Sequence, residues 1–339
     1  MSVETNVEEQ EVRTGSALVR ATFPWAKDED IGRSWRLLGI SYAVLLTAMA
    51  VAAFAPWLPL RIFGSLITGL VWVRLFIFFH DYMHGAIFRK SSLGKLAMYP
   101  VGFYTLNPPS VWKETHNYHH QNNAKMLGAA IGSYPVVTTR IWRHMKPTQK
   151  RWYKFARHPL TMVFAYFTVF IGGMCMSAFI RQPRQHWQGP LCLAVHFGTM
   201  GLLGYFLGWD VAFFVIFLPV YISNVLGAYL FYAQHNYPDV QLRDRRDWDY
   251  NFAALQSSSM MEMNSLMHWF TGNIGYHHVH HLNHKIPFYL LPTVMDAVPE
   301  LQSPGRTSWW PSDVVACLRL KIWDSSKKRM VSWSEAGVS

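Results

Sequence analysis

Apolar and polar stretches alternate along this chain on the scale of whole helices. Roughly 20 apolar helical residues cross a bilayer core, and four runs are predicted to do so: residues 37–60, 62–80, 190–208 and 211–232. Residues 56–59 (Pro-Trp-Leu-Pro) break the helical pattern near the junction of the first two runs, and residues 209–210 (Trp-Asp) separate the last two. The pattern predicts an all-α integral membrane protein with four transmembrane helices in two hairpins.

A fifth apolar run, residues 160–180, differs in its charge pattern. Arg157 precedes it, and Arg181 and Arg184 follow it. Cations at both ends are typical of a segment that enters and leaves a membrane on one side, or that lies in the interface. We therefore expect this run to be interfacial or re-entrant rather than a span.

Composition agrees with a membrane protein. The chain is 51% hydrophobic and 15% charged, whereas soluble domains carry about 25% charged residues. The net charge of +11 comes from basic residues that flank apolar runs. Positive-inside topology and anionic lipid headgroups explain such residues better than nucleic acid does, so we expect no nucleic-acid partner.

One polar segment is especially basic. Its seven cations are Arg140, Arg143, Lys146, Lys150, Arg151, Lys154 and Arg157. The simplest interpretation is a surface on the cytoplasmic face of the membrane. A docking face for an anionic headgroup or an acidic electron-transfer protein is the alternative.

Histidines form the densest chemical motif in the chain. Ten of the 16 fall in four places, which are His80-x-x-x-His84, His116-x-x-His119-His120, a lone His235, and His277-His278-x-His280-His281. On a helix, positions i, i+3 and i+4 share one face, so each motif is expected to aim its imidazoles at one point. Neutral imidazole suits iron, zinc, copper and nickel. The motifs therefore predict a metal centre.

The surrounding residues restrict the kind of centre. The chain has no HExxH motif, and no glutamate has a histidine three positions later, which excludes zincins and ferritin-like di-iron sites. His278 lies between the spacing positions, so its role is undecided. The other nine histidines are too many for one ion, whereas two ions with four or five nitrogens each would use them. The role of Asp81 is also undecided, because it either orients an imidazole or faces water.

The histidines also constrain topology. All motifs must reach one site, so an even number of spans must separate His116 from His235. Four spans then place both termini on the side of the histidines, which we expect to be cytoplasmic, in a helical cap that carries the histidine motifs. Residues 1–33 are expected to form a soluble N-terminal tail, and residues 301–339 a cytoplasmic C-terminal tail.

The order of these motifs, with Gln234 before His235, resembles the membrane fatty acid desaturase superfamily. Around the third motif, the sequence Trp-Phe-Thr-Gly-Asn-Ile-Gly-Tyr-His-His-Val-His-His-Leu (269–282) resembles bacterial and cyanobacterial acyl-lipid desaturases. Phe-Tyr-Ala-Gln-His (231–235) and Trp248-Asp249 match that branch too. The resemblance covers roughly residues 35–295, and we place a desaturase domain at 34–300.

The resemblance implies a non-haem di-iron oxidoreductase of lipid metabolism. It would use O2 to introduce a double bond into a fatty acyl chain, carried as acyl-lipid or acyl-CoA, at a cytoplasmic site of a bacterial inner membrane. Electrons would come from an external donor, a ferredoxin or a b-type cytochrome with its reductase. Trp112 and Trp269 are candidates for the lining of an acyl tunnel. The implied ligands of two iron ions (Fe2+/Fe3+) are His80, His84, His116, His119, His120, His235, His277, His280 and His281.

Other reactions use similar centres. His80-Asp-Tyr-Met-His84-Gly85 also resembles the first motif of carotenoid ketolases, and a di-iron hydroxylase or ketolase acting on an acyl chain, carotenoid or alkane is the alternative function. The context of residues 275–282 favours a desaturase. A transport protein needs ionisable residues at mid-membrane. The predicted spans hold only Arg74 and His196 as such groups, because the histidine motifs lie at the ends of the spans. We expect surface or packing roles for His144, His158, His186, His196, His268 and His284.

Overall fold

Four helices of the described chain are long and apolar enough to cross a membrane. The computed structural model describes residues 12–27, 29–126 and 132–338. The long helices are α3 (Ile31–Phe54), α4 (Leu58–His84), α11 (Gln188–Leu207) and the continuous stretch Trp209–Ala233, made of α12 (Trp209–Ala212), the π-helical η2 (Phe213–Phe217) and α13 (Leu218–Ala233). The expected mostly helical protein with four candidate membrane-spanning helices is confirmed.

The first two helices begin earlier than their apolar runs. The Asp30 side chain caps α3 by accepting a hydrogen bond of 2.7 Å from the backbone N–H of Arg33, so the helix starts six residues before the predicted position 37. Pro59 lies in the first turn of α4, where a missing N–H costs nothing. At its other end α4 continues to His84, where Gly85 at φ +67° ends it.

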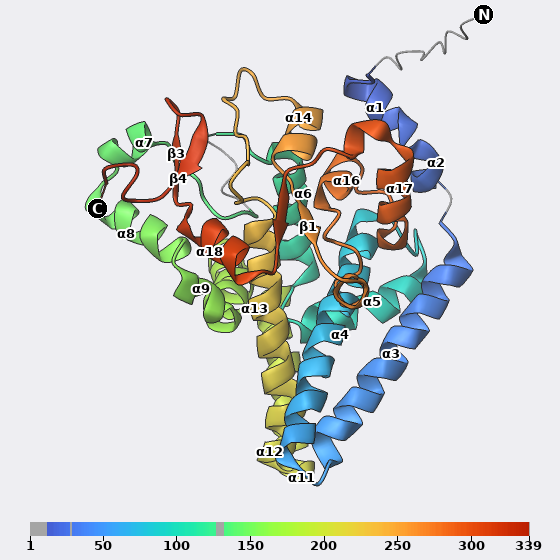
Figure 1. The fold of residues 1–339 in the computed structure, drawn as a ribbon. Helices are drawn as coiled ribbons and strands as arrows, with labels where there is room; N and C mark the ends of the chain where they lie inside the picture. The colour runs from blue at the N-terminus through green and yellow to red at the C-terminus, as the bar shows by residue number, and fades with distance from the viewer. Residues whose placement is uncertain (1–11, 28, 127–131, 339) are drawn as a thin grey trace, which may run out of the picture.

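Helix α4 lies at the centre of the bundle, between α3 and α13 (Figure 1). Val71, Leu75 and Phe78 are fully buried on it. The close approach of the α4 backbone to the α3 backbone depends on glycine. A Cβ on Gly64 would lie 2.6 Å from the backbone nitrogen of Ala52. Small residues at helix contacts are the usual means of packing helices in lipid, so α4 holds its histidine-bearing end in a fixed position.

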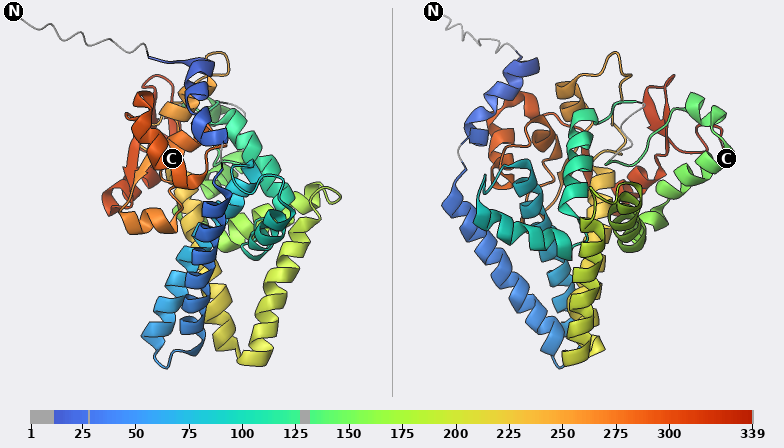
Figure 2. Two further views of the ribbon diagram at one scale, coloured as in Figure 1. Left: turned by 90° about the vertical axis from the view of Figure 1, so that its right-hand side faces the viewer. Right: turned by 180° about the vertical axis from the view of Figure 1, so that it is seen from behind.

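Shorter helices gather over that end of the long helices (Figures 1 and 2). We call this part of the chain the cap. It consists of α5 (Ser92–Tyr104), α6 (Pro109–Asn122), α14 (Tyr250–Gln256), α15 (Ser265–Phe270), α16 (His277–Leu282), η3 (Phe288–Leu290), α17 (Leu291–Ala297) and η4 (Pro299–Leu301).

The segment before α11 forms a separate series of short helices beside the cap. They are α7 (Thr139–His144), α8 (Pro147–Ala156), α9 (Pro159–Val163), the π-helical η1 (Tyr166–Ser177) and α10 (Ala178–Arg181). The apolar stretch Tyr166–Arg181 is shorter than the four long helices. Its expected place at the membrane interface stays a prediction.

Much of the expected N-terminal tail is folded. Helices α1 (Gly15–Ala21) and α2 (Phe23–Lys27) lie against the cap, and Leu18 is 2% exposed in the main hydrophobic core. Arg13 forms an ion pair of 2.8 Å with Glu300. Hydrophobic burial against a distant segment stabilises these short helices, which the local composition does not reveal. Residues 1–11 lie outside the described residues.

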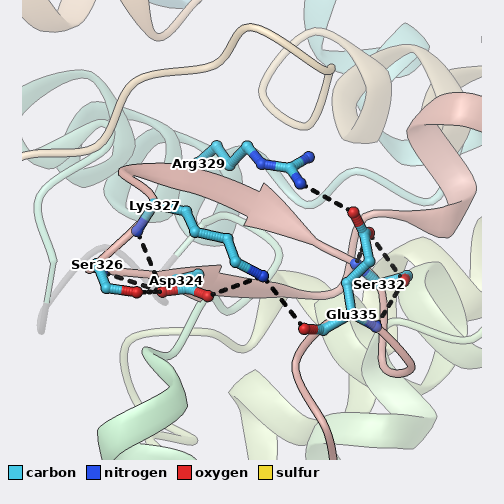
Figure 3. A network of polar contacts seen from close by, with 6 residues as sticks. All are labelled: Asp324, Ser326, Lys327, Arg329, Ser332 and Glu335. Atoms are coloured by element: carbon cyan, nitrogen blue, oxygen red, sulfur yellow. Dashed lines mark hydrogen bonds and ion pairs between the residues drawn. The ribbon is translucent and has the colours of Figure 1, made fainter.

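The C-terminal segment is also structured. Strand β1 (Met260–Glu262) pairs in parallel with β2 (Arg306–Ser308), α18 (Pro311–Arg319) follows, and β3 (Ile322–Asp324) pairs antiparallel with β4 (Arg329–Val331). Figure 3 shows how the β3–β4 hairpin contacts the end of the chain, with Arg329 3.0 Å from the Glu335 carboxylate. The Tyr153 hydroxyl donates a hydrogen bond of 2.6 Å to the Lys321 carbonyl. The hairpin therefore packs against α8 rather than extending into solvent.

Candidate metal centre

Four elements deliver the predicted histidines to one place in the cap. The end of α4 carries His80 and His84, α6 carries the second motif, α16 carries the third, and His235 lies two residues after the end of α13. The structure brings all nine candidate ligands together, in two groups whose possible ligand nitrogens lie within 4.8 Å of one another. One group is His80, His84, His116, His120 and His280, and the other is His119, His235, His277 and His281.

The division between the groups follows helical geometry. At 3.6 residues per turn, positions i and i+4 differ by about 40° around the axis, while i+3 lies about 60° to the other side. His116 and His120 accordingly share one group, and His119 joins the other. In the third motif, His280 separates in the same way from the pair at 277 and 281. The expectation that each motif points at one place is therefore wrong for these two motifs, which point at two.

The nitrogen spacing fits a shared cation. His116 Nε2 lies 3.1 Å from both His80 Nε2 and His120 Nε2. In the other group, His277 Nε2 lies 2.9 Å from His235 Nε2. A metal–imidazole bond of about 2.0–2.1 Å places two ligands at right angles about 3 Å apart. One N–H proton can form a hydrogen bond between only one pair of these nitrogens, whereas His116 Nε2 lies close to two others. The cluster therefore matches metal ligation better than a hydrogen-bonded network.

Burial holds these side chains in the form that binds a metal. Desolvation lowers the pKa of His116 and His281 well below the ordinary value, and neighbouring histidines lower it further. Burial also lowers the pKa of His235 to about 4. Both nitrogens of His84 are buried without a hydrogen-bond partner among the described residues, an arrangement that is costly unless something binds there.

An apolar cavity adjoins the two histidine groups. Its volume is about 480 Å³, and His80, His116 and His277 form part of its wall. Trp112 lines it as predicted, together with Phe231. Trp269 does not line it, and that expectation is wrong because the indole packs on the Arg74 guanidinium at 4.3 Å instead. A cavity of this size accommodates an extended apolar ligand.

Comparison with known proteins identifies the family. Residues 55–312, most of the chain, match the family model for fatty acid desaturases. The chain belongs to the fatty acid desaturase family. The resemblance inferred from the histidine motifs is thereby confirmed, and the protein is an oxidoreductase of this class.

Two relatives are similar along most of their length. A fatty acid desaturase of Bacillus subtilis (strain 168) is 27% identical over 265 residues, which cover 77% of this chain and 74% of the relative. The sn-1 acyl-lipid omega-3 desaturase (ferredoxin) of Nostoc sp. (strain 36) is 24% identical over 268 residues, which cover 77% of this chain and 72% of the relative.

Asp81 of the desaturase is buried against the cluster. The Nδ1–H of His80 donates a hydrogen bond of 2.9 Å to Asp81 Oδ1, and the backbone N–H of Phe288 donates one of 2.7 Å to Asp81 Oδ2. Asp81 is 1% exposed, so it does not face water. The carboxylate fixes the imidazole so that Nε2 points into the five-histidine group, a common arrangement around metal ligands.

Asp81→Asn tests this role. The substitution replaces one accepting oxygen by an NH2 group, so one of the two hydrogen bonds is lost. We expect iron to bind about 10–100-fold more weakly, as measured by chelator titration of the purified desaturase. Asp296→Asn on the exposed face of α17 is the matched control. Equal iron retention in the two variants would show that Asp81 does not orient a ligand.

His278 has a separate role from its neighbours. Its Nε2 lies 3.0 Å from the Leu301 carbonyl oxygen, so the side chain points away from both groups and holds η4 against α16. Among the histidines expected to pack or lie at the surface, His284 is half-buried with its ring 4.7 Å from that of His84. The spacing pattern gave no signal for this contact, because only the turn after α16 creates it.

Proposed function

We propose that the nine clustered histidines hold two iron ions and that the desaturase uses O2 to introduce a double bond into a fatty acyl chain bound in the apolar cavity. The observation that carries the proposal is the division of the histidines into groups of five and four nitrogen ligands at the wall of a cavity that suits an acyl chain. The family match supports it.

The iron ions would supply the redox chemistry that activates O2 for hydrogen removal from two adjacent methylenes. The chain's own residues perform positioning. Trp112 and Phe231 form the cavity wall beside the histidines, with the Phe231 ring 4.9 Å from that of His119. A methylene chain offers no polar handle, so reaction at one C–C unit depends on the shape of this wall. The same apolar wall excludes water from the reacting carbons.

The membrane arrangement follows from the four long helices. We place α3–α4 and α11–α13 as two hairpins, with the cap, both termini and the histidines on the cytoplasmic side of a bacterial inner membrane. The cations of α7 and α8 beside the cap support this orientation. The acyl carrier is a membrane lipid rather than acyl-CoA, and a ferredoxin supplies electrons, as the name of the Nostoc relative suggests; a b-type cytochrome with its reductase is the alternative donor.

The fatty acids of a host that expresses the desaturase test this function. We expect a new unsaturated species, located by mass spectrometry with double-bond assignment, that is absent with His280→Ala. A hydroxylated or ketolated product would be consistent with the proposed metal centre, but it would show that the reaction is hydroxylation or ketolation rather than desaturation. An unchanged profile in a host with a competent ferredoxin would contradict an acyl substrate.

A further inference from the structure

The acyl cavity reaches the protein surface at helix α8. Trp152 and Phe155 line the cavity, yet they are 71% and 48% exposed. His80, His116 and His277 line the same cavity. One continuous space therefore leads from the histidine groups to the outer face of α8, where it has a mouth.

The surface around this mouth has the composition of one that contacts lipid. Leu160 on α9 is 55% exposed, and Phe164 and Phe167 beyond it are 47% and 48% exposed. A contiguous set of large exposed apolar side chains is stable in contact with a membrane. Exposed tryptophan, here Trp152, is enriched where hydrocarbon meets headgroups. An acyl chain that entered this mouth from a bilayer would come from the side.

Helix α8 carries positive charge at the same place. It contains Lys150, Arg151 and Lys154 and no acidic residue. None of these cations forms an ion pair with another described residue, and Arg151 and Lys154 are exposed. Arg151 directly precedes Trp152 and lies one turn from Phe155, so a cation stands at the rim of the mouth.

The position of α8 is fixed by a buried cation at its end. Arg157, 1% exposed, donates hydrogen bonds of 2.9 Å to the Pro135 carbonyl and 3.2 Å to the Tyr232 hydroxyl. Tyr232 lies on α13, three residues before His235. The helix that forms the mouth is thus attached to the helix that leads into the metal centre, and the mouth is preformed.

We propose that the cations of α8 bind the phosphate of an anionic phospholipid in the bilayer and thereby admit its acyl chain into the cavity between Trp152 and Phe155. This inference rests on the proposed function and names the headgroup class of its substrate. The arrangement fits a lipid phosphate at the interface, because the charges and the exposed apolar side chains occupy adjacent faces of one helix.

Lipid retention and turnover test the proposal together. The purified, iron-loaded desaturase is first examined by native mass spectrometry with phosphatidylglycerol or phosphatidylcholine of identical acyl chains. It is then assayed with reduced ferredoxin in vesicles of each lipid. We expect a preference for phosphatidylglycerol in both measurements. Arg151→Gln/Lys154→Gln should reduce that preference by about fivefold for each charge removed, the factor that corresponds to about 1 kcal/mol per cation at an anionic surface.

Matched variants separate charge at the mouth from charge elsewhere. Arg245→Gln/Arg246→Gln removes two cations from the exposed loop before α14 and should keep the preference. Because Lys154 also stacks near Trp142, Arg151→Gln alone guards against a folding defect in the double variant.

The outcomes discriminate between the two proposals. Equal retention of both lipids, or a preference that survives Arg151→Gln/Lys154→Gln, would overturn the headgroup site. Double bonds formed only in soluble acyl-CoA would overturn lateral entry and leave the desaturase reaction intact. Selective retention of phosphatidylglycerol without a double bond in any substrate would support the binding site and contradict the proposed function instead.

Discussion

Removing His281 or His280 is expected to reduce desaturation by at least about 1,000-fold, as is typical of essential catalytic groups, with different losses of iron. His281 belongs to the group of four nitrogens and His280 to the group of five. His281→Ala leaves three protein ligands in its group, whereas His280→Ala leaves four. The bound iron should therefore fall from two ions per chain toward one in His281→Ala and fall less in His280→Ala. Elemental analysis and product quantification of the purified proteins measure both effects.

His278→Gln is the control for these substitutions. His278 lies on the same short helix and is fully buried, but its imidazole contacts the Leu301 carbonyl. We expect this variant to be less stable to heat while it retains two iron ions. Equal iron loss in all three variants would mean that the helix, rather than the individual nitrogens, determines metal binding, and would contradict the assignment of ligands.

The sequence predicts the local features of this site because they depend on short periods. The spacing in His116-x-x-His119-His120 predicts that the imidazoles lie on the same side of a helix. The 3.6-residue period also explains why residues i and i+4 point to one metal group and residue i+3 to the other. Which pairs from different helices form one group depends on how α4, α6 and α16 pack. His80 lies 36 residues from His116 along the chain, and no local pattern encodes that distance.

The parts that the sequence did not predict are stabilised by contacts between distant segments. Leu18 packs into the main hydrophobic core and Arg13 pairs with Glu300, so both attach the N-terminal segment to the cap. Strand β1 pairs with β2 some 46 positions later. Strands of three residues have too little pattern to be distinguished from loops. Trp269 was a candidate for the tunnel lining, but its indole packs instead on the buried Arg74 guanidinium in a cation–π contact.

Filling the acyl cavity from α13 should abolish turnover of long acyl chains without loss of iron. Gly227 lines the cavity, and a Cβ placed on it would meet no atom within 4 Å. Phe231, one turn further along, is the residue that contacts the His119 ring. The side chain of Gly227→Phe therefore projects into the space that a substrate needs next to the metal centre. Since a displacement of about 1 Å can cost about 100-fold in rate, we expect at least that loss for long chains.

Gly227→Ala separates a filled cavity from a disturbed helix. Its single methyl group enters open space, and alanine favours a helix over glycine by about 1 kcal/mol, so this variant should retain activity and iron. If Gly227→Phe blocks the cavity, shorter acyl chains should still be substrates, because a chain that ends before residue 227 would still reach the histidines. Activity of Gly227→Phe restored with shorter chains would locate the substrate in this cavity. Unchanged turnover of long chains by an iron-replete Gly227→Phe would place the substrate elsewhere, because the phenyl ring and an acyl chain cannot occupy the same space beside Phe231.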